Sequence, residues 1–273
     1  MSVSPIADNK SYELYNGDCF EVLKQFPEET FDMIFADPPY MLSKTGKTCY
    51  NGKLVKLDKG AWDESRGISE DFEFHKQWLA LCKKLLKPNG TLWVSGTYHS
   101  IFSCGYAMLL LGYHVLNNVA WFKPNATPNL SCKYFTASHE SLVWARKDKK
   151  AKHYFNYDAM KNGDFPQDFI KKPHTQMRTV WAIPTTQMSE KTFGKHPTQK
   201  PLALLERIIT ASTHENDLIL DPFMGSGTTG VAALKLKRRF VGVELNPQYY
   251  DLAGKRIANV LDVKQSDLFT REG

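Results

Sequence analysis

The sequence lacks the features that mark membrane proteins and disulfide-stapled proteins. No run of eighteen apolar residues occurs, and no basic stretch followed by an apolar one opens the chain, so neither a membrane span nor a secretory signal is expected. The five cysteines are an odd number without a C-x-x-C pair, which predicts neither a disulfide framework nor a zinc site. These absences leave a cytoplasmic protein without a metal site as the expectation.

The composition is that of one large globular unit. The chain has 273 residues, of which 42% are hydrophobic and 12% aromatic, enough to bury a single large core. No internal repeat or low-complexity stretch interrupts it. We therefore expect a single domain over residues 1–273 with one insertion.

Positive charge is concentrated in one region. The formal net charge is +6, and residues 145–200 contain twelve Lys or Arg and five Asp or Glu, so the rest of the chain is nearly neutral. Such a region suits a phosphate backbone, because each neutralised phosphate releases counterions. A solvated basic loop without a polyanion partner is the alternative.

Hydrophobic patterning alternates between short apolar runs and longer stretches with a helical period. This alternation predicts an α/β fold with a mostly parallel sheet covered on both faces. The predicted strands are 33–36, 91–95, 115–121, 141–145, 218–220 and 240–243. The predicted helices are 20–26, 70–86, 100–111, 201–212, 228–236 and 248–260.

The most specific motif is D-P-P-Y, Asp37 to Tyr40, directly after the strand 33–36. Ligands of open α/β sheets bind beyond the carboxyl ends of strands, so this position suits chemistry. Two prolines stiffen the backbone and leave its carbonyls as acceptors. An amine bonded to the Asp37 carboxylate and the Pro38 carbonyl would aim its lone pair at an electrophile, while Tyr40 would stack on a base taken out of a helix. A plain turn is the alternative.

The second motif is the glycine-rich turn from Asp221 to Gly230, which follows a predicted strand and opens a helix. Gly225, Gly227 and Gly230 satisfy G-x-G-x-x-G, and Glu244 ends the next strand, where a carboxylate can hold ribose hydroxyls. The pattern fits a nicotinamide dinucleotide and S-adenosylmethionine equally well. It does not fit a P-loop, because no Gly-Lys-Ser/Thr follows.

Two shorter segments carry weaker signals. The string 195–201, K-H-P-T-Q-K-P, leads into a helix, and Lys200 beside that helix terminus could bind a carboxylate. His196 is interpreted as a loop histidine without a chemical role. In the turn 16–19, N-G-D-C, Asp18 is either a helix N-cap or a cofactor contact.

Two long segments interrupt the alternation of strands and helices. Residues 42–66 are polar and look like a long loop at the carboxyl edge of the sheet. Residues 147–195 are basic, interleaved with aromatic residues, and show no clear period. Loops of this length inside a compact domain are usually functional.

Together these motifs resemble the amino-group DNA methyltransferases of the β class. The resemblance covers residues 12–258, and the order of the motifs, with D-P-P-Y before the glycine-rich turn, is that of the class. The string 196–201 followed by 204–209 is especially typical. Residues 128–136 and 58–63 look like the GATC-type adenine methyltransferase subgroup, which can also act on single strands.

The resemblance implies a fold, a reaction and a partner. The fold is a seven-stranded, mostly parallel, Rossmann-like sheet with one antiparallel strand and a circularly permuted motif order. The reaction moves a methyl group from S-adenosylmethionine to the N6 amine of a flipped adenine in double- or single-stranded DNA. Residues 147–195 would be the target-recognition region. Related enzymes are often homodimers, which makes a homodimer a further expectation.

The resemblance also implies roles for individual residues. The catalytic segment would be Asp37, Pro38, Pro39 and Tyr40. Phe223 and the glycine turn would line the methionine and ribose side of the cofactor, Glu244 the ribose, Asp18 and Cys19 the adenine end, and Lys200 with Thr198 the carboxylate. The complete set of expected cofactor contacts is Asp18, Cys19, Asp37, Thr198, Lys200, Asp221, Phe223, Gly225, Gly227, Thr228 and Glu244.

Three alternatives remain at this point. N4-cytosine methylation is close to the expected reaction. A nicotinamide-dependent oxidoreductase would explain the glycine turn but leave D-P-P-Y without a role. A catalytically silent nucleic-acid-binding module would explain the charge but not an acceptor tetrapeptide at a strand end.

Overall fold

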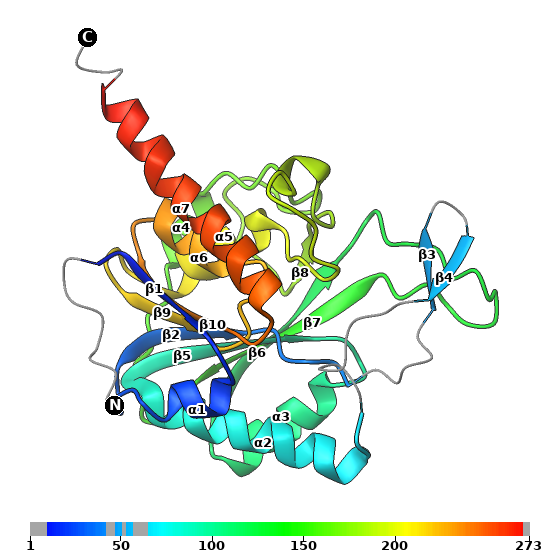
Figure 1. Cartoon of the computed structure of the whole chain (residues 1–273), viewed down its shortest axis with the longest axis horizontal. Coiled ribbons are helices and arrows are strands. Elements are labelled where there is room, and N and C mark those ends of the chain that lie inside the picture. Colours follow the sequence, from blue (N-terminus) through cyan, green and yellow to red (C-terminus); the bar gives the residue numbers. More distant parts are fainter. Residues whose placement is uncertain (1–9, 42–46, 51–52, 57–64, 270–273) are drawn as a thin grey trace.

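The structure is a computed structural model that describes residues 10–41, 47–50, 53–56 and 65–269. Eight strands form one sheet in the order β1-β10-β9-β2-β5-β7-β6-β8 (Figure 1). Only β7 runs against its neighbours β5 and β6, and every other pair in this sheet is parallel. The mostly parallel sheet with one antiparallel strand is confirmed, with eight strands where seven were predicted.

The predicted helices and strands are present, and most of their ends shift by a few residues. The larger differences are that the strand predicted at 91–95 begins at Leu86 and the helix predicted at 248–260 ends at Phe269. The strands of the large sheet are β1 (Tyr12–Asn16), β2 (Phe31–Ala36), β5 (Leu86–Gly96), β6 (His114–Phe122), β7 (His139–Arg146), β8 (Val180–Ala182), β9 (Leu218–Asp221) and β10 (Arg239–Glu244). The helices are α1 (Cys19–Leu23), α2 (Ile68–Leu85), α3 (Ile101–Leu110), α4 (Tyr157–Asn162), α5 (Leu202–Ser212), α6 (Thr228–Lys235) and α7 (Pro247–Phe269). Across the described ranges, no helix has the length and apolarity needed to cross a bilayer.

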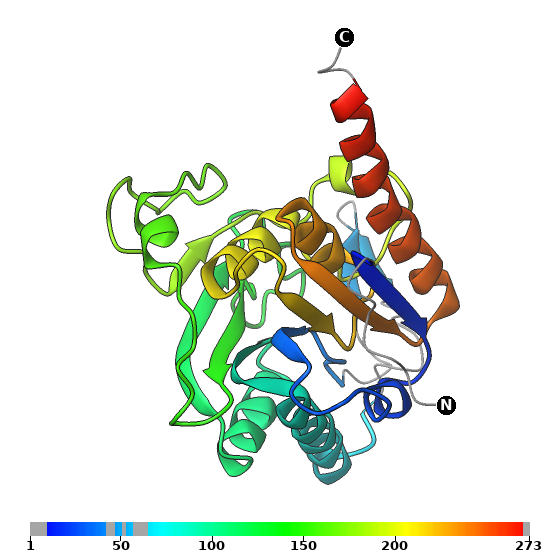
Figure 2. The same ribbon diagram turned by 90° about the vertical axis from the view of Figure 1, so that its left-hand side faces the viewer.

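Helices cover both faces of the sheet. One buried cluster packs α1, α2 and α3 against one face, with Leu23, Trp78 and Cys104 among its members. The other cluster packs α5, α6 and α7 against the opposite face, through residues such as Leu205 and Ile257. Figure 2 shows the two helical layers on either side of the sheet.

Strand β2 is buried on both of its faces, and its residues 33–36 form a continuous apolar run. Met33 and Phe35 belong to the cluster under α5, α6 and α7, whereas Ile34 and Ala36 belong to the cluster under α1, α2 and α3. All four side chains are at most 1% exposed. A strand covered on both faces needs apolar residues at every position, which is the pattern in the sequence.

Four chain segments converge where the parallel strands end. Strand β1 ends at Asn16, β9 at Asp221 and β10 at Glu244, and Asp37 directly follows β2. Strand β2 pairs with β9, Met33 with Ile219, so the D-P-P-Y strand and the glycine-turn strand are neighbours in the sheet although distant in sequence. The permuted motif order is thus compatible with one continuous site at this edge, as expected for open α/β sheets.

Both long segments contain regular structure that periodicity did not reveal. The predicted loop 42–66 holds a two-stranded hairpin of β3 (Lys47–Tyr50) and β4 (Lys53–Lys56). The segment 147–195 contains α4, β8 and a short 3₁₀ helix (Met188–Glu190). These elements have three to six residues, too few to show a period in the sequence.

Candidate active site and cofactor cavity

The D-P-P-Y segment places a buried carboxylate at the end of β2. The Tyr40 hydroxyl donates to Asp37 Oδ1 at 2.8 Å, and Lys200 Nζ donates to Asp37 Oδ2 at 2.5 Å. Burial raises the pKa of Asp37, and the Lys200 ammonium opposes this rise. Each oxygen of the carboxylate therefore already accepts one hydrogen bond, so a ligand's N–H group would share an oxygen with Tyr40 or Lys200.

Lys200 also lies near a second carboxylate. Its Nζ is 3.5 Å from Glu140 Oε2, and Lys123 Nζ is 2.6 Å from Glu140 Oε1. Burial alone would raise the pKa of Glu140, but the ammonium groups of Lys200 and Lys123 together hold it at about 2. Glu140 is thus a permanent anion beside the catalytic segment, and sequence reasoning did not identify it.

The glycine-rich turn is fixed by hydrogen bonds to the ends of β9 and β10. The backbone N–H of Gly225 donates to Glu244 Oε2 at 2.9 Å, and that of Asn246 donates to Oε1 at 2.8 Å. Thr229 Oγ1 donates to Asp221 Oδ2 at 2.6 Å, and burial raises the pKa of Asp221 to about 7. Both carboxylates are therefore held in one orientation at the rim of the turn.

The three glycines of the turn have different surroundings. Gly225 has φ +51°, and a Cβ there would lie 3.2 Å from the His196 ring. Gly227 has φ +75°, and a Cβ there would lie 2.9 Å from Ala253 Cβ in α7. A Cβ on Gly230 would lie 2.6 Å from Ile257 Cδ1. Gly225 faces a cavity, whereas Gly227 and Gly230 allow α6 and α7 to pack closely.

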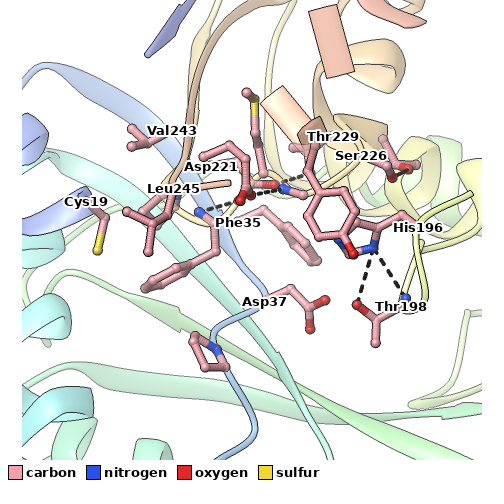
Figure 3. Close-up of a pocket in the computed structure, with 18 of the residues that line it drawn as sticks. Cys19, Phe35, Asp37, His196, Thr198, Asp221, Ser226, Thr229, Val243 and Leu245 are labelled. Atoms are coloured by element: carbon pink, nitrogen blue, oxygen red, sulfur yellow. Dashed lines mark hydrogen bonds between the residues drawn. The ribbon is translucent and has the colours of Figure 1, made fainter. Parts of the chain in front are cut away.

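A cavity of about 230 Å³ opens between the D-P-P-Y segment and the glycine turn (Figure 3). Apolar side chains, among them Phe20, Phe74 and Leu245, share its wall with the polar groups. The predicted cofactor residues that line it are Asp18, Cys19, Asp37, Thr198, Lys200, Asp221, Phe223, Gly225, Thr228 and Glu244. One cavity thus collects all of the expected contacts except Gly227.

The other predicted catalytic residues, Pro38, Pro39 and Tyr40, differ in their access to the cavity. Pro39 lines the cavity with Asp37, but Pro38 and the Tyr40 side chain are buried next to it. The Tyr40 side chain is 7% exposed, and its hydroxyl contacts Asp37, Glu140 and Lys200. In this arrangement Tyr40 presents no open face to a stacked base.

His196, for which the sequence indicated no chemical role, lies in the wall of the cavity. It is 8% exposed, lines the cavity, and packs its ring against Tyr249 with centroids 4.2 Å apart. Burial lowers its pKa to about 4, so the ring is neutral near pH 7 and its Nδ1 accepts from Thr198 N at 3.3 Å. Its partner Tyr249 carried no signal in the sequence, because the contact joins two distant segments.

Lys200 lies in the cavity wall, and its ammonium bonds to the D-P-P-Y segment. The resemblance placed its ammonium on the cofactor carboxylate, and the helix terminus suggested an anion site. The structure instead shows it bonded to Asp37 and Tyr40, at 2.5 and 2.9 Å. Lys200 also lines the cavity, and its contact with the cofactor carboxylate stays a prediction.

The basic segment 147–195 contacts the sheet at both ends of its strands, the active-site edge and the opposite edge. Strand β7 is antiparallel, so it begins at the active-site edge and Arg146 ends at the opposite edge. There, Lys147 Nζ donates to the Leu86 carbonyl and Lys152 N to Asn89 Oδ1. The chain returns with β8, after which Thr185 N bonds to Asn125 Oδ1. Only the later part of the segment lies at the active-site edge.

Two further expectations concern groups at the site. The described residues contain no cluster of three or more His, Cys, Asp or Glu side chains able to hold a metal ion. The segment 58–63, which contributed to the GATC-type resemblance, lies entirely outside the described residues.

Comparison with known proteins agrees with this geometry. The profile of the N6_N4_Mtase family, described as DNA methylase, matches residues 31–255. Type II methyltransferase M2.DpnII of Streptococcus pneumoniae is 48% identical over 258 residues, which cover 94% of this chain and 93% of the relative. Type II methyltransferase M2.MboI of Moraxella bovis is 44% identical over 271 residues, which cover 98% and 96%.

Solved structures give the same result. The M1.HpyAVI–SAM complex has a TM-score of 0.66 and 29% identity, covering 90% of this chain and 98% of that one. The cytosine-N4-specific PvuII DNA methyltransferase has a TM-score of 0.67 at 21% identity, covering 93% and 91%, which shows a shared fold. The resemblance drawn from the motifs is confirmed: the chain belongs to the N6_N4_Mtase family of DNA methylases.

Proposed function

We propose that the protein transfers a methyl group from S-adenosylmethionine to the N6 amine of an adenine flipped out of DNA. The observation that carries this proposal is that the Asp37 carboxylate lines the same cavity as Gly225 and Glu244. An acceptor for the target amine and a pocket for the cofactor are thereby adjacent. A nicotinamide oxidoreductase would leave the Asp37–Lys200 pair without a role.

The lining of the cavity fits S-adenosylmethionine. Each oxygen of Glu244 already accepts one backbone N–H, which fixes the carboxylate and leaves lone pairs for ribose hydroxyls. Phe20, Phe74 and Leu245 offer an apolar wall for a purine ring. The absence of a side chain at Gly225 keeps open the space beside the His196 ring. A related protein, M1.HpyAVI, has been solved as a complex with S-adenosylmethionine.

The protein's contribution to the reaction is alignment and desolvation. Bound S-adenosylmethionine would supply a methyl group that its sulfonium centre already makes electrophilic. Asp37 would accept a hydrogen bond from the target amine, the Pro38 carbonyl would accept a second, and the stiff backbone would hold both acceptors. Asp37 is only partly exposed, and a bound base and cofactor would displace water from it, which strengthens these bonds. No covalent intermediate with the protein is needed.

Recognition of DNA is assigned to the side chains at the active-site edge. These belong to the later part of the segment 147–195, after β8, and to the loop 123–138 between β6 and β7. Tyr134 and Phe135 in this loop are 71% and 97% exposed, and Lys133 is exposed beside them. Exposed aromatic rings next to a cation suit stacking on bases and pairing with phosphates.

Nucleoside analysis tests the proposal directly. DNA is incubated with the protein and isotope-labelled S-adenosylmethionine, digested to nucleosides, and examined by mass spectrometry. Labelled N6-methyl-2′-deoxyadenosine supports the proposal, and labelled N4-methyl-2′-deoxycytidine supports the alternative. Absence of label from DNA, in spite of measured cofactor binding, would exclude both. Duplex and single-stranded oligonucleotides with and without GATC settle the specificity.

Two further properties stay predictions. The first is the cytoplasmic location expected from the sequence. A homodimer would explain the exposed apolar side chains along α3, which are Phe102, Tyr106, Leu109 and Leu110. Light scattering of the wild type and of a Phe102→Glu variant would test whether two copies associate through this helix.

A further inference from the structure

Glu140 is a buried acidic residue to which the proposed reaction assigns no role. It is the second residue of β7, at the edge of the sheet where Asp37 lies, and it is 8% exposed. One of its oxygens, Oε1, accepts from Lys123 Nζ at 2.6 Å. The other, Oε2, is 3.3 Å from the Tyr40 hydroxyl and 3.5 Å from Lys200 Nζ. A buried carboxylate is retained only where cations and donors compensate its desolvation.

Lys200 lies between two carboxylates at unequal distances. Its Nζ is 2.5 Å from Asp37 Oδ2 and 3.5 Å from Glu140 Oε2, and its side chain is 7% exposed. An ammonium this close to Asp37 competes with any other donor for the same oxygen. A target amine that donates to Asp37 therefore gains if the ammonium moves toward the second carboxylate.

We propose that Glu140 is a positioning residue for methyl transfer, which provides Lys200 with a second carboxylate so that Asp37 can accept the target amine. This inference rests on the proposed function. In this structure the ammonium is closer to Asp37 than to Glu140, and with the amine in place it moves the short distance to Glu140. Lys123, whose Nζ also lies 4.9 Å from the centre of the Trp121 ring, keeps Glu140 in place.

The charges around Lys200 are balanced for such a movement. Asp37 and Glu140 supply two negative charges, and Lys200 and Lys123 supply two positive ones. Tyr40, the remaining ionisable group in contact, stays neutral because burial raises its pKa. Moving the ammonium from one carboxylate to the other leaves the net charge of the cluster unchanged. The movement therefore requires neither a proton nor a counterion from solvent.

Substitution of Glu140 by Gln tests the proposal, because Gln keeps the shape and removes the charge. We expect kcat to fall about 10- to 100-fold, since the amine then competes with a Lys200 that has no second carboxylate. The dissociation constant for S-adenosylmethionine should stay within about twofold, because the cavity lining is unchanged. Glu140→Asp, which restores the charge, should recover part of the rate.

The pH profile separates this role from a structural one. The charge of Glu140 raises the pKa of both Asp37 and Lys200. Its removal should therefore move both limbs of the kcat profile to lower pH. The matched control is Asp32→Asn, which removes the Lys87 partner at the other end of β2 and should leave both limbs in place.

A double variant shows whether Glu140 acts through Lys200. In a Lys200→Met background, Glu140→Gln should cause less than a twofold further loss if the two residues share one function. If the two substitutions lower kcat by independent factors that multiply, this inference is wrong while the proposed function stands. The same holds if an active Glu140→Gln protein shows both limbs of the kcat profile at their wild-type pH. A wild-type protein that methylates no DNA would overturn the proposed function, and this inference with it.

Discussion

Asp168, in the basic segment, and Arg207, in α5, form an ion pair that is sealed from solvent. Arg207 Nη1 lies 2.6 Å from Asp168 Oδ2, and the two side chains are 1% and 2% exposed. The other oxygen, Oδ1, accepts from the backbone N–H groups of Ile170 and Ala182. The guanidinium packs over the Phe165 ring, with Arg207 Cζ 4.7 Å from the ring centre. These contacts fasten the segment 147–195 to a core helix.

The first prediction concerns this pair. Asp168→Ala should lower the free energy of unfolding by about 3–5 kcal/mol, because it leaves the Arg207 charge buried and unpaired. Urea denaturation followed by circular dichroism measures the loss. The double variant Asp168→Leu/Arg207→Met should be more stable than Asp168→Ala, since it buries no charge. Equal stability of Asp168→Ala and wild type would show that the pair is open to solvent.

The second prediction concerns the acceptor. Asp37→Ala should abolish methyl transfer to DNA, because it removes the carboxylate that accepts the hydrogen bond from the target amine. Binding of S-adenosylmethionine, measured by isothermal titration calorimetry, should largely survive, because the glycine turn and Glu244 are untouched. Near-normal turnover in this variant would contradict the role assigned to Asp37.

The sequence was informative wherever a motif follows directly on an apolar run. Asp37 and Asp221 could be placed at strand ends because the preceding residues are continuously apolar. Glu140 and His196 could not be assigned roles, because their partners are distant in sequence: Tyr40 and Glu140 are 100 residues apart. The position of Lys152 depends on the direction of β7, which periodicity does not reveal.

The third prediction separates the glycines of the turn. Gly227→Ala should lower stability by about 2–4 kcal/mol, because φ is +75° and the new Cβ would lie 2.9 Å from Ala253 Cβ. Gly225→Ala is also strained, by its φ of +51°, but its new Cβ meets only the His196 ring, at 3.2 Å, so it should lose less stability and weaken cofactor binding. Thermal unfolding and calorimetric titration of both variants test the contrast. A Gly227→Ala protein that is as stable as the wild type but unable to bind the cofactor would refute this contrast.

The fourth prediction concerns stability at low pH. His75 in α2 is 1% exposed, accepts from Trp78 Nε1 at 3.2 Å, and has its pKa lowered to about 4 by burial. Since its pKa is lower in the folded than in the unfolded state, stability is present above the unfolded value of about 6.5 and is lost as pH falls toward 4.

The variant His75→Gln keeps an acceptor for Trp78 but does not titrate in this range. Between pH 7 and about pH 5, it should therefore lose about 2 kcal/mol less unfolding free energy than the wild type. Urea denaturation at both pH values measures this difference. Parallel losses in the two proteins would mean that His75 is protonated in the folded state.

The last prediction concerns which lysines contact DNA. Lys133 lies in the loop between β6 and β7, and Lys195 is adjacent to His196 in the cavity wall, so both are at the active-site edge. Lys149 and Lys150 are equally exposed but follow Arg146 at the opposite edge. A DNA strand that delivers a base to Asp37 must cross the first edge and cannot reach the second at the same time.

Salt dependence distinguishes the two sets. Each lysine that neutralises a phosphate contributes about −0.9 to the slope of log K against log salt for duplex DNA, and about −0.7 for single strands. Lys133→Ala/Lys195→Ala should thus make the slope for duplex DNA shallower by up to about 1.8, whereas Lys149→Ala/Lys150→Ala should leave it unchanged. Fluorescence anisotropy with a labelled oligonucleotide at several salt concentrations gives both slopes. A shallower slope for Lys149→Ala/Lys150→Ala would contradict this prediction. It would mean that DNA binds at the edge where β7 ends, away from the cavity that contains Asp37.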